Sequence, residues 1–253
     1  MKLGDFEITD RIGLGTNRLT NTRANVAFVR AAVAAGVQMV DTAHLYTGGQ
    51  SEETIGLALH PPPEGCIVAT KGGFGGPGRG RPEVLHAEIE ESLRRLRTDV
   101  IQLYYLHRVD PDTPIEASLG AIKEYVERGK ILRVGVSEVT VEQVERARKV
   151  VPIVAVQNHY NLSERKYEGV VDHCEREGIV FVPFFPLRGD GGAQLSRIAK
   201  KHGATTRQIT LAWLLRRSPA MLPIPGTLSL EHLKENLAAA TIELTDEEFE
   251  ALR

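Results

Sequence analysis

The chain has 253 residues, of which 42% are hydrophobic and 25% are charged, and its formal net charge is -2. This length suits one large α/β domain or two smaller ones, and the ordinary composition indicates a globular protein with a sizeable core. A charge so close to zero gives no basic surface field, which disfavours nucleic acids and anionic membranes as partners and favours a small molecule.

Short β-branched runs alternate with longer amphipathic segments from one end of the chain to the other. Strands are predicted at residues 11–15, 37–41, 66–71, 100–107, 131–137, 152–157, 179–185 and 221–226. Helices are predicted between them, with clear ends at 23–36, which closes on Gly36, at 81–96, which opens with Pro82, and at 114–129, which closes on Gly129.

This alternation predicts the fold. Near-continuous apolar strands followed by helices are typical of a parallel sheet, and eight such units that close on themselves make a (β/α)8 TIM barrel. An open, doubly wound sheet is the alternative, but it would not require so regular a count. Because no linker-like or low-complexity stretch divides the chain, we expect a single α/β domain over residues 1–253.

The two cysteines and the N-terminal stretch bear on the compartment. Cys66 and Cys174 have neither a metal-ligand spacing nor the pattern of a disulfide framework. The opening residues MKLGDFEITDRIGLG lack the basic and apolar pattern of a secretion signal, and no apolar run is long enough to span a bilayer. These features predict a cytoplasmic enzyme.

Four side chains are expected at the carboxyl ends of the strands, where barrel enzymes place their active sites. Asp41, Lys71 and His107 end the second, third and fourth predicted strands, and Tyr46 lies in the loop after the second. Each alone could be a cap, a strand end or a core residue. Together they suggest acid catalysis, because a buried ammonium at Lys71 would stabilise the phenolate of Tyr46, whose ordinary pKa is about 10. Asp41 would hold Lys71, and His107 could donate a neutral N–H to a carbonyl oxygen.

Longer motifs carry a resemblance to a known family. The chain resembles the aldo-keto reductases from residue 11 to 250, in the ordered stretches VDTAHLYTGGQSEETIGLAL, VATKGG, QLYYLHR, RVGVSEVTVEQVE, AVQNHYNL, FVPFFPL and IPGTLSLEHLKENLAAA. The resemblance, which is to short bacterial reductases in particular, implies a (β/α)8 barrel and hydride transfer from a nicotinamide cofactor to an aldehyde or ketone. It matches Tyr46 to the proton donor, and Asp41, Lys71 and His107 to the supports of that donor.

The resemblance also implies contacts to the nicotinamide half of the cofactor. Ser137 and Gln157 match positions that hold the carboxamide, and Phe184 matches the ring that stacks on nicotinamide. Glu138 and Phe185 depart from the family pattern, because an asparagine and a polar residue are expected at these positions.

For the rest of the cofactor, the matching residues lie in three loops. Thr16 and Asn17 match a loop that touches the ribose and the substrate, Pro186 and Leu187 match a loop near the pyrophosphate, and the last set comprises Gly226, Thr227, His232, Glu235 and Asn236. Glu235 and Asn236 match adenine contacts. Gly226 and His232 replace a lysine and an arginine that often grip the 2′-phosphate, although a helix N-terminus there could bind phosphate through backbone N–H groups. NADPH is the expected cofactor, and NADH is possible.

Other interpretations remain open. The run GFGGPG at 73–78 fits a dinucleotide fingerprint, but Pro77 prevents a helix from starting inside it, so a mobile loop is expected. His44, His107 and His159 could form the metal site of a hydrolase, yet they lack an H-x-H pair and carboxylate partners, so no metal is expected. A cofactor-binding interaction protein with little turnover is a further alternative on the same fold. The sequence does not identify the substrate or the oligomeric state.

Overall fold

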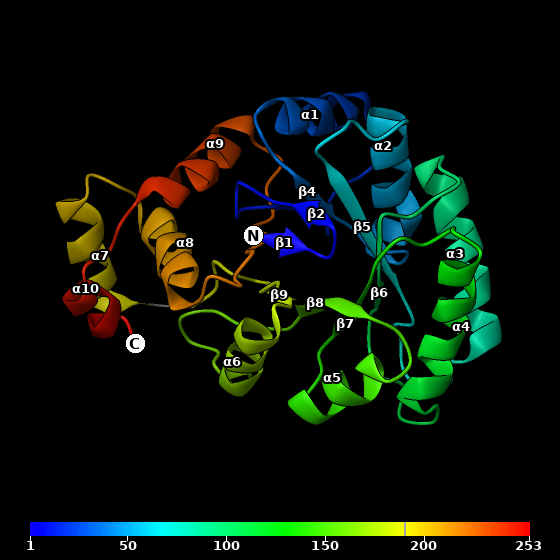
Figure 1. Cartoon of the computed structure of the whole chain (residues 1–253). Coiled ribbons are helices and arrows are strands. Elements are labelled where there is room, and N and C mark those ends of the chain that lie inside the picture. The colour runs from blue at the N-terminus through cyan, green and yellow to red at the C-terminus, as the bar shows by residue number, and fades with distance from the viewer. Residues whose placement is uncertain (190) are drawn as a thin grey trace.

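The structure is a computed structural model that describes residues 1–189 and 191–253. Its main sheet contains seven parallel strands in chain order, which are β3 (Leu14–Gly15), β4 (Met39–Asp41), β5 (Ile67–Gly72), β6 (Leu103–Leu106), β7 (Val134–Ser137), β8 (Ile153–Gln157) and β9 (Val180–Phe181). The sheet curls around an axis, with the helices outside it (Figure 1).

The eighth predicted strand, at 221–226, is an extended segment that closes the barrel without forming a full strand. Isolated parallel bridges join it to β9 at one end and to β3 at the other. The backbone N–H groups of Gly13 and Gly15 donate to the carbonyl oxygens of Pro223 (2.9 Å) and Pro225 (3.3 Å). Proline has no N–H with which to return these bonds, so the ladder beside β3 is one-sided. The prediction of eight strands is wrong for this element, but the predicted (β/α)8 barrel is confirmed.

Helices follow the strands in the predicted alternation. They are α1 (Arg23–Ala34), α2 (Gln50–Leu59), α3 (Pro82–Leu96), α4 (Ile115–Glu127), α5 (Val141–Arg148), α6 (Glu168–Glu177), α7 (Gly192–Lys201), α8 (Thr206–Arg217), α9 (Leu230–Ala238) and α10 (Asp246–Ala251). Figure 1 shows α1 to α6, α8 and α9 around the sheet, with α7 and α10 beyond α8. The predicted end signals act as expected, since Pro82 opens α3 and Gly36 follows α1 with a positive φ of 106°.

A short N-terminal hairpin was not predicted from the sequence. It pairs β1 (Lys2–Leu3) with β2 (Phe6–Glu7), and it lies in the middle of the ring of strands in Figure 1. Leu3 and Ile8 are fully buried and pack with inward-facing residues from the beginnings of the strands, such as Met39. The hairpin therefore covers the end of the barrel at which the strands begin, and leaves the opposite end for the site.

Side-chain alternation along the strands determines what points into the barrel at that opposite end. The interior apolar cluster includes Met39, Ala69, Tyr105 and Ala155. Since side chains on a strand alternate with a period of two, the residues two positions further along face the same way. Those residues are Asp41, Lys71, His107 and Gln157.

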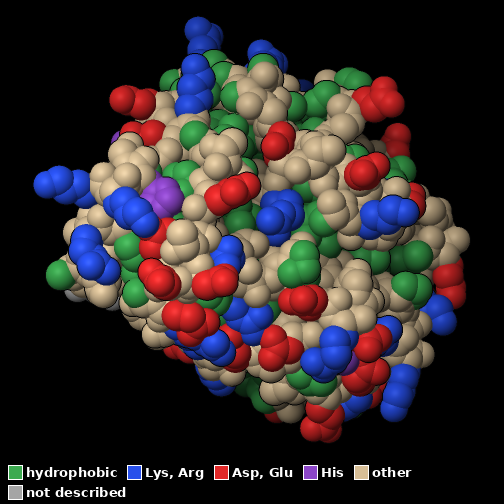
Figure 2. All heavy atoms as spheres, turned by 60° about the vertical axis from the view of Figure 1, so that its left-hand side comes forward, with side chains coloured by type: hydrophobic (Ala, Val, Ile, Leu, Met, Phe, Trp, Pro, Cys, Tyr) green, Lys and Arg blue, Asp and Glu red, His purple; other side chains and the backbone are tan. Residues whose placement is uncertain are grey.

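The outer surface carries charges of both signs. Figure 2 brings the α7, α8 and α10 side forward, and there lysine and arginine side chains are intermingled with aspartate and glutamate. None of the helices within the described ranges is both long and apolar enough to cross a membrane.

Candidate active site

A cavity of about 1180 Å³ opens at the carboxyl ends of the strands. Small-molecule pockets usually measure roughly 300 to 1,000 Å³, so this one has room for an extended ligand and a second small molecule. Most of the predicted site residues line it, and they are Thr16, Asn17, Asp41, Tyr46, His107, Gln157, Phe184, Pro186, Leu187, Gly226, Thr227, His232 and Asn236.

Three predicted residues are not part of the cavity wall. Lys71 is fully buried behind Asp41 and Tyr46, and Ser137 is buried behind Arg108, whose Nη1 donates to the Ser137 hydroxyl (3.0 Å). Glu235 lies on α9, outside the residues that line the cavity. The structure therefore brings the four candidate catalytic residues together, and leaves two of the cofactor candidates, Ser137 and Glu235, outside the cavity wall.

The Lys71 ammonium is the centre of a buried polar cluster. Its Nζ donates to Asp41 Oδ2 (2.7 Å), to the Thr42 carbonyl (2.6 Å) and to the Tyr46 hydroxyl (3.4 Å). The other oxygen of Asp41 accepts from Gln157 Nε2 (2.9 Å). An ammonium has three donors, and each has an oxygen partner here, so the charge is fully compensated although it is buried.

These surroundings set the protonation states of Lys71 and Tyr46. Burial lowers the pKa of Lys71, but Asp41 and Tyr46 together outweigh burial, and the pKa lies above its ordinary value. Burial raises the pKa of Tyr46, whereas the Lys71 charge lowers it, and the net direction is upward. Lys71 thus acts in the expected sense but does not make the phenol more acidic overall. Tyr46 remains protonated, which is the form that can donate a proton.

His107 lies beside Tyr46 with its ring edge-on, at a centroid distance of 6.0 Å and an interplanar angle of 80°. Burial holds the pKa of His107 well below its usual range, and the charges of Lys71 and Arg108 act in the same direction. Its Nδ1 has no hydrogen-bond partner within the described part of the chain. A neutral imidazole that retains one N–H therefore faces the cavity.

A left-handed turn presents Tyr46 to the cavity. Thr47, Gly48 and Gly49 have positive φ values of 49°, 64° and 93°. The Thr47 hydroxyl donates to the Leu19 carbonyl (2.6 Å), which ties the turn to the loop after β3. Glycine is favoured at position 49 because its φ is positive, and a Cβ there would also displace the Arg95 guanidinium.

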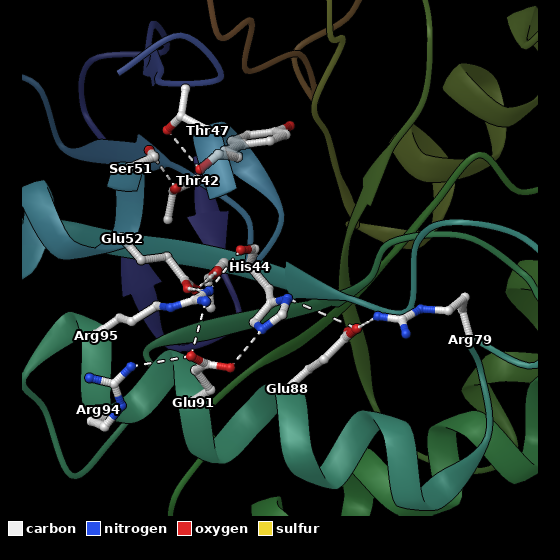
Figure 3. Close-up of polar contacts among 12 residues, drawn as sticks. Thr42, His44, Thr47, Ser51, Glu52, Arg79, Glu88, Glu91, Arg94 and Arg95 are labelled. Atoms are coloured by element: carbon white, nitrogen blue, oxygen red, sulfur yellow. Dashed lines mark hydrogen bonds and ion pairs between the residues drawn. The ribbon is translucent and has the colours of Figure 1, made fainter. Parts of the chain in front are cut away.

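An ionic network fastens the same loop to α3, as Figure 3 shows. Arg95 of α3 donates to the His44 carbonyl (2.9 Å) and to the fully buried Glu52 carboxylate (3.3 Å). The His44 ring lies 3.4 Å from Glu91 and 3.9 Å from Glu88, both on α3. The loop that carries Tyr46 is therefore held on both sides by residues of the barrel wall.

The three histidines considered as metal ligands have separate surroundings. His44 faces α3, His107 faces the cavity, and His159 stacks on Phe184 at a centroid distance of 5.2 Å. Over the described ranges, no group of three or more His, Cys, Asp or Glu side chains is placed to hold a metal ion.

The two departures from the family pattern share a backbone feature. Glu138 and Phe185 both have positive φ values, of 55° and 51°. An asparagine tolerates this region better than glutamate does, which is a physical reason for the expected residue at 138. The Glu138 carboxylate accepts from the His159 backbone N–H (2.6 Å) and the Tyr167 hydroxyl (3.3 Å), and it does not line the cavity.

Sequence reasoning missed the cations of the site. Four arginines line the cavity, which are Arg18, Arg108, Arg188 and Arg207. Three of them directly follow a predicted residue, and Arg108 ends the quoted stretch QLYYLHR, so the sequence did hold a signal for these three. Arg207 lies on α8, far in sequence from every predicted motif, and gave no such signal.

The fold and the position of the cavity define a (β/α)8-barrel enzyme. The sequence matches the Aldo/keto reductase family over residues 11–194 and 190–253, and the chain belongs to this family. It is therefore an NAD(P)H-dependent oxidoreductase, as the resemblance implied.

Individual relatives agree with this assignment. The chain is 38% identical to an uncharacterized oxidoreductase of Schizosaccharomyces pombe, with 100% of this chain and 88% of the relative covered. It is also 38% identical to pyridoxine 4-dehydrogenase of Escherichia coli, with 88% and 83% covered. The crystal structure of the thermostable aldo-keto reductase Tm1743 with the inhibitor epalrestat matches with a TM-score of 0.91 and 35% identity, with 100% and 97% covered. A Klebsiella pneumoniae aldo/keto reductase in complex with NADP and acetate matches with a TM-score of 0.85 and 31% identity, with 96% and 89% covered.

Proposed function

We propose that the protein reduces an aldehyde or a ketone to the alcohol with NADPH, and that Tyr46 is the general acid. The observation that carries the proposal is the 3.4 Å contact between the hydroxyl of Tyr46, which lines the cavity, and the charged ammonium of Lys71 buried behind it. When hydride reaches the carbonyl carbon, the oxygen becomes an alkoxide and takes the Tyr46 proton. The phenolate that remains is then stabilised by Lys71.

Asp41 and His107 have supporting roles in this proposal. Asp41 keeps Lys71 charged and fixed through the 2.7 Å ion pair. His107, neutral and beside Tyr46, donates its N–H to the carbonyl oxygen and stabilises the negative charge that develops there. In these roles His107 stays neutral and Asp41 stays ionised throughout turnover.

The residues around the cavity fit NADPH, which when bound would supply the hydride. The volume of the cavity and the four arginines that line it suit an extended ligand with anionic phosphates. We assign the carboxamide to Ser137 and Gln157 and the nicotinamide face to Phe184. The remaining candidate contacts are Thr16, Asn17, Pro186, Leu187, Gly226, Thr227, His232, Glu235 and Asn236. NADH is the second candidate cofactor, because Gly226 and His232 provide no lysine or arginine.

The direct test is the turnover of Tyr46→Phe. We expect a loss of about 10²- to 10⁴-fold in kcat, the usual contribution of general acid catalysis, with little change in NADPH affinity. The assay follows NADPH oxidation with aromatic and aliphatic aldehydes. Pyridoxal belongs in this panel because one relative is a pyridoxine 4-dehydrogenase.

Tyr125→Phe is the matched control, since Tyr125 lies on α4, away from the residues that line the cavity, and its hydroxyl donates to the His86 carbonyl (3.5 Å). Near wild-type rates in Tyr46→Phe would show that another group donates the proton. NADPH binding by the wild type without turnover of any aldehyde would instead favour a cofactor-binding interaction protein.

A further inference from the structure

Arg108 is a cation at the reaction centre that the proposed mechanism does not use. It directly follows His107, lines the cavity and is half-buried. Its guanidinium carbon lies 5.1 Å from the ring centroid of Phe74 and 5.6 Å from that of Phe184. The Phe74 ring also packs on His107, at a centroid distance of 4.7 Å. Arg108 is therefore held between aromatic rings, next to the residues that surround the reacting carbonyl.

The hydrogen bonds of Arg108 leave most of its donors free. Nη1 donates to the His107 carbonyl (2.6 Å) and to the Ser137 hydroxyl (3.0 Å), which are both neutral acceptors. Within residues 1–189 and 191–253, no acceptor is recorded for Nε or Nη2, and no carboxylate forms an ion pair with the guanidinium. A guanidinium has five N–H donors, so a planar edge of this one is available to a ligand.

Glu138 is the acidic residue that acts on Arg108 electrostatically, but it does not neutralise it at contact distance. Its carboxylate is already bonded to the His159 backbone and the Tyr167 hydroxyl. Burial lowers the pKa of Arg108, the Glu138 charge offsets this only in part, and the net direction is downward. An anionic ligand in the cavity could therefore pair with Arg108, whose guanidinium is already partly desolvated.

The phosphates of the cofactor do not pair with Arg108 in the proposed arrangement. The phosphate candidates lie around Gly226, His232 and the loop at 186–187, whereas Arg108 adjoins His107, Ser137 and Phe184, at the nicotinamide and carbonyl end. An anion that pairs with Arg108 would therefore belong to the carbonyl substrate and not to the cofactor.

We propose that Arg108 binds an anionic group, a carboxylate or a phosphate, of the carbonyl substrate, so that the enzyme prefers acidic carbonyl compounds over neutral ones. This inference rests on the proposed function. Arginine is suited to the task because its planar fork pairs with two oxygens at once. Leu45 and Phe74, which are 40% and 39% exposed and line the cavity, would contact an apolar or aromatic body between the carbonyl and the anion.

The test compares meta-carboxybenzaldehyde with its neutral, nearly isosteric partner meta-carbamoylbenzaldehyde, at saturating NADPH. The measured quantity is the ratio of kcat/KM for the acid to kcat/KM for the amide. We expect this ratio to fall about tenfold or more in Arg108→Gln, because charge-assisted hydrogen bonds are lost. Arg108→Lys should retain part of it, since lysine keeps the charge without the fork.

Arg176→Gln is the matched control, because it removes the same charge from an exposed position on α6, outside the residues that line the cavity. Its ratio should stay within about twofold of the wild-type ratio. An unchanged ratio in Arg108→Gln, or an equal fall in the control, would overturn the proposal. The wild type alone provides a second test. The acid is expected to have a lower KM than the amide, and a lower KM for the amide would also overturn the proposal.

These outcomes are separable from a failure of the proposed function. If the wild type oxidises no NADPH with either aldehyde, the reductase assignment itself is contradicted. If it reduces both aldehydes but has no preference for the acid, only the role of Arg108 is wrong.

Discussion

His107 illustrates how a single residue takes its chemistry from its neighbours. Burial and the charges of Lys71 and Arg108 disfavour its protonated form, and the same Lys71 charge favours the phenolate of Tyr46. One buried ammonium therefore acts on both groups that would meet the carbonyl oxygen, and it keeps one of them an uncharged hydrogen-bond donor.

This arrangement predicts a dependence of stability on pH. The pKa of His107 in the folded state lies well below that of the unfolded chain, about 6.5. As the pH falls through that value, the unfolded state binds a proton that the folded state does not, so stability decreases. In His107→Gln this contribution is absent, and the variant should lose about 1 to 2 kcal/mol less than the wild type between about pH 7 and about pH 5. Urea unfolding at both pH values measures the difference, and equal losses would contradict a neutral, buried imidazole.

Arg207 bears on the choice of cofactor. Its neighbour Gln208 donates to the Glu235 carbonyl (3.1 Å), which places the start of α8 beside α9, where His232 and Asn236 line the cavity. Gly226 and His232 provide neither a lysine nor an arginine for the 2′-phosphate of NADPH. Arg207 can supply the missing cation from a different helix.

We therefore expect Arg207→Gln to lower the ratio of kcat/KM for NADPH to that for NADH by about tenfold, because an arginine–phosphate pair is charge-assisted. His232→Gln should have a smaller effect. The two ratios are measured with one neutral aldehyde. A wild-type ratio in Arg207→Gln, together with a large fall in His232→Gln, would assign recognition of the 2′-phosphate to the start of α9 instead.

Among the elements, the glycine-rich segment between β5 and α3 is anchored by the carboxylate of Asp110, which lies in the loop between β6 and α4. Asp110 accepts from the backbone N–H groups of Gly78 (3.0 Å) and Gly80 (2.8 Å) and from the Thr113 hydroxyl (2.8 Å). The mobility expected for this segment stays a prediction, but its far end is anchored. Phe74, which contacts His107 and Arg108, precedes the anchor in the same segment.

The anchor can be tested by Asp110→Asn. Burial raises the pKa of Asp110, but hydrogen bonds from the Asp112 and Gly80 backbones, the Thr113 hydroxyl and the Gly78 backbone outweigh it and lower the pKa to about 2. Because this value is below the ordinary one of about 3.9, the stabilisation is present above about pH 4 and is lost as the pH falls towards 2.

At neutral pH the variant should lose about 1.5 to 3 kcal/mol, and its deficit relative to the wild type should shrink below about pH 4. Chemical unfolding between these pH values is the measurement. Asp112→Asn, at an exposed position in the same loop, is the control and should change stability by less than about 0.5 kcal/mol. A constant deficit at all pH values would rule out ionised Asp110 as the anchor.

Elements differ in how well the sequence predicts them. The ends of α1 and α3 were predictable because Gly36 and Pro82 act through local backbone chemistry. The N-terminal hairpin was missed, since its two-residue strands are too short for any periodicity and are stabilised by packing of Leu3 and Ile8 under the barrel. The segment at 221–226 has the apolar character of a strand, but its alternate prolines halve the hydrogen bonds it can make to β3.

At the scale of the whole molecule, strand alternation explains why much of the candidate site could be predicted. Asp41, Lys71 and His107 were assigned to strand ends, and a closed parallel barrel brings all strand ends to one rim. The burial and the neighbours of these side chains could not be predicted from the sequence, because they depend on three-dimensional contacts. The upward shift of the Tyr46 pKa arises from burial, and the approach of Arg207 arises from the packing of α8 against α9.

The central claim is that the protein transfers hydride from NADPH to a carbonyl carbon, with Tyr46 supplying the proton. Its most direct test uses NADPH that carries deuterium at the transferable C4 position, with mass spectrometry of the alcohol product. We expect one deuterium atom on the carbinol carbon in the wild-type reaction, and formation of the same product slowed about 10²- to 10⁴-fold in Tyr46→Phe. Alcohol formed without deuterium, or formed at an equal rate by Tyr46→Phe, would contradict it.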